Sequence, residues 1–111
     1  MAVYEVKALP DAPLAASARF HANHLPLIEI ALVTLDEALT LIYPPADHTH
    51  RGWRVAAVQS LARAHAPRRV NAITGVDGEA ILAATDYLSH AEGITGQYLL
   101  LDSNGAAPVL S

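Results

Sequence analysis

Hydrophobic and polar positions along the first third of the chain predict a strand followed by a helix. The β-branched and aromatic residues of segment 3–9 predict the strand. Asp11 then stands where an N-cap would, with Pro13 in the first turn of an alanine-rich segment of high helix propensity. Pro26 lacks an N–H group and should kink or restart that helix, which continues over residues 25–35 with apolar residues on nearly every side. Such a helix must be covered on two faces.

The same alternation continues to the end of the chain. A short apolar run over residues 38–43 predicts a buried strand. The next helix should start near Asp47 or Thr49 and end near His65, again with apolar residues on two faces. The remaining predicted elements are a strand over residues 69–73, a helix over 78–92 capped by Asp77 and ended by Gly93, and a strand over 97–101.

Strands that alternate with helices imply βαβ units. The pattern therefore predicts an α/β layered domain with about four mainly parallel strands and right-handed crossovers. A chain of 111 residues has the length of one domain, so residues 1–111 are expected to form a single unit.

Composition adds an expectation about partners. Hydrophobic residues make up 52% of the chain and charged residues only 16%, so part of a small surface must be apolar, which favours self-association or a partner. The net charge of −4 argues against nucleic acid. The chain has no cysteine, no signal-peptide pattern and no apolar run long enough to span a bilayer, so we expect a cytoplasmic protein without a membrane partner.

Two sequence segments carry a family resemblance. They are SLARAHAPRRVNAI (Ser60 to Ile73) and YLSHAEGITGQYLLLDSNG (Tyr87 to Gly105). In type, order and spacing they resemble the C-terminal half of the short-chain dehydrogenase/reductase family, and residues 20–43 resemble its preceding helix and strand more weakly. The resemblance implies a Rossmann-like three-layer domain, truncated relative to the full dehydrogenase fold. It assigns structural positions to Asn23, Asn71, Thr95, Gly96, Gln97 and Asp102.

The resemblance also points to what the chain lacks. A dinucleotide site needs a glycine-rich turn after the first strand, and none of the six glycines follows the strand over 3–9. Family spacing places Asp47 at the catalytic Tyr position and Arg51 at the catalytic Lys position, and neither preserves the proton chemistry. We therefore expect no catalytic residue, no NAD(P) binding by this chain alone, and a non-catalytic relative of the family.

Two clusters could hold a metal ion. Asp47, His48 and His50 have the donor types of a metal site, although a solvated helix N-terminus capped by Asp47 is the favoured interpretation. His21 and His24 could share a helix face, with the same reservation about missing ligands. No metal is expected.

Two further positions could contact a ligand. Trp53 with Arg51 and Arg54 could stack on a ring, but packing of Trp53 under the arginine stems is favoured. Thr74 and Gly75 lie at the carboxyl end of a strand, where open α/β sheets bind ligands, and could line a residual pocket.

The leading hypothesis is an oligomeric structural or binding protein. The resemblance implies a homodimer or homotetramer through the helices near 25–35 and 53–64, with the strand over 97–101 in a second interface. One alternative is a residual NAD(P)-dependent oxidoreductase or nucleotide-binding subunit completed by another chain. Another is a small-ligand or metal-binding module.

Overall fold

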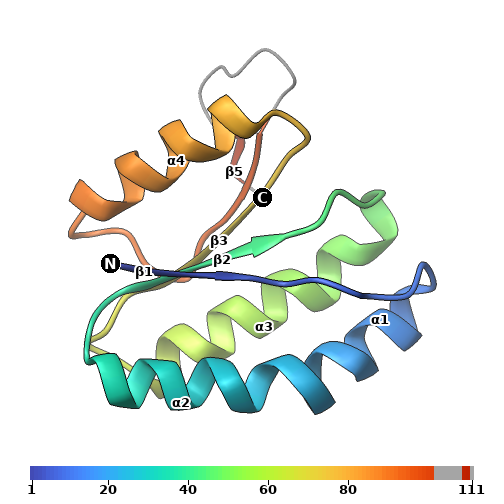
Figure 1. Ribbon diagram of the computed structural model, residues 1–111, viewed down its shortest axis with the longest axis horizontal. Coiled ribbons are helices and arrows are strands. Elements are labelled where there is room, and N and C mark those ends of the chain that lie inside the picture. Colours follow the sequence, from blue (N-terminus) through green and yellow to red (C-terminus); the bar gives the residue numbers. More distant parts are fainter. Residues whose placement is uncertain (102–108, 111) are drawn as a thin grey trace.

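The computed structural model describes residues 1–101 and 109–110, which form an α/β sheet structure (Figure 1). Strands β1 (Ala2–Glu5), β2 (Leu39–Tyr43), β3 (Val70–Thr74) and β4 (Tyr98–Leu100) run parallel in that spatial order. A short strand β5 (Val109–Leu110), which the pattern did not predict, pairs antiparallel with β4. The predicted fold class is confirmed. Asp102 lies outside the described residues.

Helices cover the two faces of the sheet, which gives three layers. On one face lie α1 (Pro13–Arg19), the π-helical turn η1 (Phe20–His24), α2 (Leu25–Leu35) and α3 (Arg51–Ala64), the last preceded by the 3-10 turn η2 (His48–His50). Helix α4 (Gly78–His90) lies on the opposite face (Figure 1).

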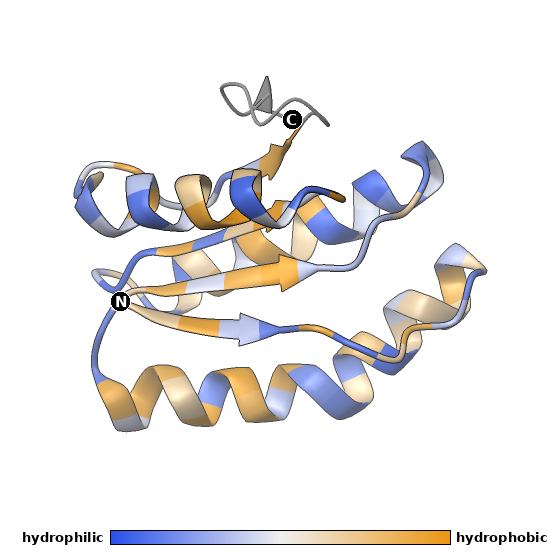
Figure 2. Cartoon of the chain, turned by 45° about the horizontal axis from the view of Figure 1, so that its top comes forward, coloured by the Kyte–Doolittle hydropathy of each residue, from blue (hydrophilic) through white to orange (hydrophobic). Residues whose placement is uncertain are grey.

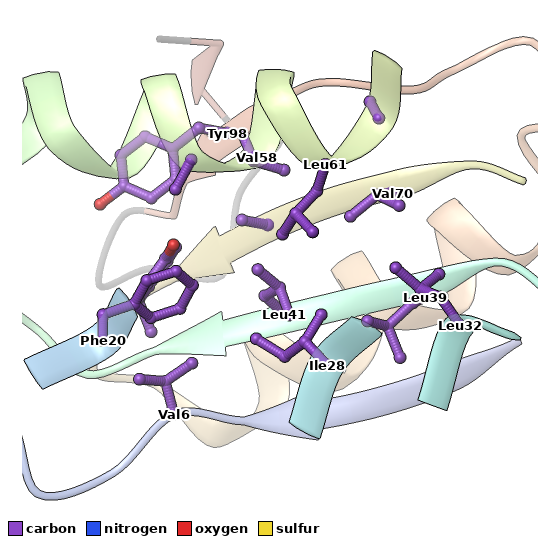
Figure 3. Close-up of a cluster of buried hydrophobic side chains, with 14 residues drawn as sticks. Val6, Phe20, Ile28, Leu32, Leu39, Leu41, Val58, Leu61, Val70 and Tyr98 are labelled. Atoms are coloured by element: carbon purple, nitrogen blue, oxygen red, sulfur yellow. The ribbon is translucent and has the colours of Figure 1, made fainter. Parts of the chain in front are cut away.

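The larger core lies between the sheet and the first group of helices. Phe20, Ile28 and Leu32 pack there against Leu41 of β2 and the apolar face of α3 (Figure 3). A smaller cluster of Ile73, Ala84, Leu88 and Leu99 fills the space under α4. Successive side chains of β3 therefore point to opposite faces of the sheet and pack into different cores, as expected for a pleated strand.

The crossovers between parallel strands do not share one hand. The strands follow one another in one direction across the sheet, yet the helices linking β1 to β2 and β2 to β3 lie on one face and α4 on the other. A change of face without a change of direction reverses the hand, so the prediction of uniformly right-handed crossovers is wrong. Helix α4 instead covers the apolar Ile73 and Leu99, which the other helices cannot reach.

The π-helical turn accommodates Pro26 within a continuous helix. The Leu25 amide donates to the Phe20 carbonyl, five residues back rather than four. In a regular α-helix the Pro26 ring would clash with the carbonyl four residues earlier, and the wider turn moves that carbonyl away. At the position of the predicted kink, the helix therefore has one wider turn that holds an extra residue.

Three predicted boundaries are wrong by a few residues. Strand β1 ends at Glu5, before Ala8 adopts a left-handed backbone with φ of 61°. Ala12 rather than Asp11 is the N-cap of α1, because the Asp11 carbonyl instead accepts a hydrogen bond from His50. Helix α4 ends at His90 with Ala91 as its C-cap, two residues before the predicted end at residue 92. In the described part of the chain no helix is both long and apolar enough to cross a bilayer.

Candidate functional site

The densest group of polar and aromatic side chains lies where β1 and β2 end and α3 begins. Trp53 of α3 packs against Phe20 and Tyr43, with ring centroids 5.4 and 5.5 Å apart. The carboxyl ends of parallel strands are where open α/β sheets bind ligands, so this edge is the first candidate for a site.

Asp47 caps the turn that leads into α3. Its Oδ1 accepts hydrogen bonds from the Thr49 hydroxyl and from the Thr49 backbone amide. These bonds, the hydroxyl first, hold the pKa of the Asp47 carboxyl below its ordinary value. Asp47 is therefore an ionised cap at neutral pH, as the favoured interpretation predicted.

His50 is buried and both of its ring nitrogens are engaged. Trp53 Nε1 donates to His50 Nδ1 at 3.2 Å, so Nε2 carries the proton and donates to the Asp11 carbonyl at 2.8 Å. Neither nitrogen is left with a lone pair for a metal. His48 and Asp47 are exposed beside it. In the residues that the structure describes, no group of three or more metal-ligating side chains is brought together.

His21 and His24 fall within η1 and do not form a pair of ligands. His24 receives a hydrogen bond from the Tyr4 hydroxyl at Nδ1 and donates from Nε2 to the Lys7 carbonyl, both at 2.9 Å. His21 donates from Nδ1 to the Ser17 carbonyl at 2.7 Å. His24 therefore ties the helix to the segment after β1 through both of its ring nitrogens.

Arg54 lies beneath Trp53 instead of covering it. Arg51 is exposed, but Arg54 is only 2% exposed, with its guanidinium carbon 4.7 Å from the Tyr43 ring centroid and 5.6 Å from that of Trp53. The expectation that both arginine stems shield Trp53 is therefore wrong for Arg54. Its spacing of four and seven residues from Val58 and Leu61 places it on their buried face, a signal that the sequence held.

Thr74 and Gly75 take part in contacts within the fold. The Thr74 hydroxyl donates to the carbonyls of Tyr43 and Pro44 at 3.0 and 3.2 Å. A side chain at Gly75 would meet Leu101 at 3.0 Å. These contacts join the ends of neighbouring strands, and a pocket at this position stays a prediction.

The residues of the two resembling segments meet in one hydrogen-bonded cluster. Asn71 bonds to Ile94 and Gln97, the Thr95 hydroxyl accepts from the Val70 amide, and Gly96, with φ of +74°, donates to the Val70 carbonyl at 2.7 Å. The cluster fixes the loop between α4 and β4 beneath β3. Asn23, by contrast, is exposed in η1.

Residues 4–101 match the family model of short chain dehydrogenase-like proteins, named SDR-like. The chain belongs to the SDR-like family. Neither a search of curated proteins nor one of solved structures finds a match.

Asp47 and Arg51, which the resemblance places at the catalytic Tyr and Lys positions, are a helix cap and a solvent-exposed side chain. Burial raises the pKa of the Tyr43 hydroxyl at the end of β2, with a smaller opposing effect of Arg54. A phenol activated for proton transfer needs the opposite shift.

Sequence reasoning missed a cavity in the SDR-like domain. It has a volume of about 360 Å³ and lies between the loops over 9–11 and 44–47, with His50 and Arg54 from the start of α3. Apolar and proline side chains form much of its wall, and the loops that build it belong to segments distant in sequence.

Proposed function

We propose that this SDR-like chain is a non-catalytic subunit that self-associates through the outer face of α2 and α3. The observation that carries the proposal is the exposure of Leu27, Ile30 and Val33, at 54%, 62% and 64%, on a helix that buries only Ile28 and Leu32. Apolar colour accordingly surrounds α2, including the side away from the sheet (Figure 2). An apolar helix face of this kind on a small domain is typical of an interface.

A groove beside this face supports a second copy as the occupant. It has a volume of about 470 Å³ and lies between α2 and α3, where Ala56, Ser60 and Ala64 present small side chains next to Trp53. Small residues let another helix approach closely. One copy thus offers both an apolar ridge and a groove, which is the self-complementarity that a two-fold interface requires. The family resemblance implies pairing of these same helices.

The helix N-termini support the absence of a dinucleotide function in this chain. A pyrophosphate would need free amide groups at a helix N-terminus after a parallel strand. In α4 the Asp77 carboxylate accepts from the Glu79 amide at 2.9 Å, and α3 is preceded by the capping Asp47. Helix α1 begins with Pro13, which has no amide hydrogen. These residues do not fit an anionic cofactor, and the carboxylates at the starts of α3 and α4 would repel it.

Light scattering coupled to size-exclusion chromatography tests the proposal. The wild-type chain should elute at twice or four times its 11.8 kDa mass at micromolar concentration. The double variant I30K/V33K should shift to the monomer, because two ammonium groups would be buried in the interface. The matched control is L82K, since Leu82 is 72% exposed on α4, on the other side of the sheet. A monomeric wild type, or equal dissociation by both variants, would contradict the proposal.

A further inference from the structure

Arg54 is a buried cation whose partners are all neutral. Its Nη1 donates to the Pro44 carbonyl at 2.9 Å and to the Tyr98 hydroxyl at 3.2 Å, and its guanidinium lies against the rings of Tyr43 and Trp53. No carboxylate in the described residues forms an ion pair with it. Burying a charge without a counterion has a large cost in free energy, so an unpaired cation at this position suggests that a counterion binds there.

One edge of the guanidinium is left without a protein acceptor. Among the described side chains, the buried polar atoms that lack a hydrogen-bond partner are Arg54 Nε and the hydroxyl of its neighbour Tyr43. The hydrogen bonds that Arg54 donates to Pro44 and Tyr98 both come from Nη1. Nε and Nη2 form the side of the guanidinium that binds a carboxylate through two parallel hydrogen bonds.

Arg54 also lines the cavity at the ends of β1 and β2. The cavity walls are apolar near Leu9, Pro10 and Pro44, while the exposed Asp11 and Asp47 add negative charge near the opening. That charge disfavours phosphate and other multivalent anions. The wall exposes polar as well as apolar atoms, and the unpartnered edge of the guanidinium offers the two donors that a single carboxylate on a compact body would use.

We propose that this cavity is a binding site for small monocarboxylic acids, with Arg54 as the residue that binds the carboxylate. The ligand carboxylate accepts from Arg54 Nε and Nη2 and supplies the counterion that the fold does not provide. The site uses neither the groove between α2 and α3 nor any residue of the proposed interface. Ligand binding and self-association can therefore be tested independently.

Titration of the full chain with benzoate tests the site, with benzamide as its neutral isostere. In a nitrogen–proton NMR spectrum, benzoate in the millimolar range should shift the Arg54 Nε–H signal, and benzamide should bind at least tenfold more weakly. Arg54→Met should weaken benzoate binding at least tenfold while the protein stays folded, because an apolar side chain of similar length replaces a buried charge. Arg63→Met, an exposed arginine on the same helix, should leave binding unchanged.

Several results would overturn the proposal. These are no shift at Arg54, equal binding of benzamide, unchanged binding by Arg54→Met, or phosphate binding more tightly than benzoate. If Arg54→Met does not fold, the comparison of benzoate with benzamide on the wild-type Arg54 signal decides alone.

Discussion

The side-chain oxygen of Asn71 accepts a hydrogen bond of 3.0 Å from the backbone amide of Gln97. Its Nδ2 donates to the Ile94 carbonyl at 3.0 Å, and Asn71 is only 2% exposed. One buried amide thereby joins β3 to two positions in the loop that enters β4. Asn71→Leu should lower the free energy of unfolding by roughly 2–4 kcal/mol, because it strands a buried donor and acceptor.

Urea denaturation measures that loss. Asn23→Ala is the control, since Asn23 is exposed and its replacement should change stability by no more than about 0.5 kcal/mol. Equal effects of the two substitutions would show that the Asn71 contacts do not stabilise the fold.

Arg69 closes the C-terminal end of α4. Its Nη1 donates to the carbonyls of Leu88 and Ala91 at 2.9 and 2.8 Å, and these carbonyls also accept from the backbone amides of Ala91 and Ile94 at 3.3 and 3.0 Å. Arg69→Met should cost roughly 1.5–3 kcal/mol of unfolding free energy. Arg63→Met serves as the comparison, and thermal unfolding should separate the two variants clearly. If Arg69→Met left the free energy of unfolding unchanged, the Arg69 contacts would not explain where α4 ends.

Two leucines of α4 should differ strongly in how much their truncation to alanine destabilises the fold. Leu88 is fully buried and Leu82 is 72% exposed. Leu88→Ala should destabilise by about 2–5 kcal/mol because it opens a cavity under the helix. Leu82→Ala should stay within about 0.5 kcal/mol. Chemical denaturation of both variants checks that α4 uses the face assigned to it, and the reverse order would contradict that assignment.

The Asp47 cap should make stability depend on pH. Hydrogen bonds from Thr49 lower the folded-state pKa of Asp47 below its ordinary value of 3.8, so the ionised carboxylate stabilises the folded state above that value. This contribution is lost as the pH falls through the folded-state pKa. Asp47→Asn should therefore be less stable than wild type at neutral pH, and the difference should shrink on acidification. A difference that is constant with pH would exclude the charged cap.

Trp53 reports on association because it is the only tryptophan of the chain and lines the groove. Its emission should move to shorter wavelength as the protein concentration rises and a second copy excludes water from the indole. The I30K/V33K variant should keep the emission of the dilute protein at all concentrations. Emission that does not depend on concentration in the wild type would place Trp53 outside the interface.

Local pattern was enough to predict most elements of the fold. The apolar run over 38–43 and the capping residue Asp77 can be recognised from neighbouring residues alone. Strand β2 and helix α4 lie within a few residues of the bounds predicted from them. The family resemblance added the sequence segments around Asn71 and Gly96, and in the structure these segments meet in one hydrogen-bonded cluster.

The rest depended on contacts between distant segments. The face chosen by α4 follows from which apolar residues of β3 and β4 remain uncovered, and no window of sequence contains that information. The burial of Arg54 could be read from its helical spacing, but its carbonyl partner at Pro44 and its hydroxyl partner at Tyr98 are set by tertiary packing. The cavity beside it has no local signal at all.

The π-helical turn at Phe20–His24 sets the rotation of everything that follows it in α2. Each residue added to or removed from a helix turns the downstream side chains by roughly 100°. If the same residues formed a regular α-helix instead, Ile28 and Leu32 would rotate out of the core. Deleting one residue would keep their register, but regular α-helical hydrogen bonds would then set a carbonyl against the Pro26 ring.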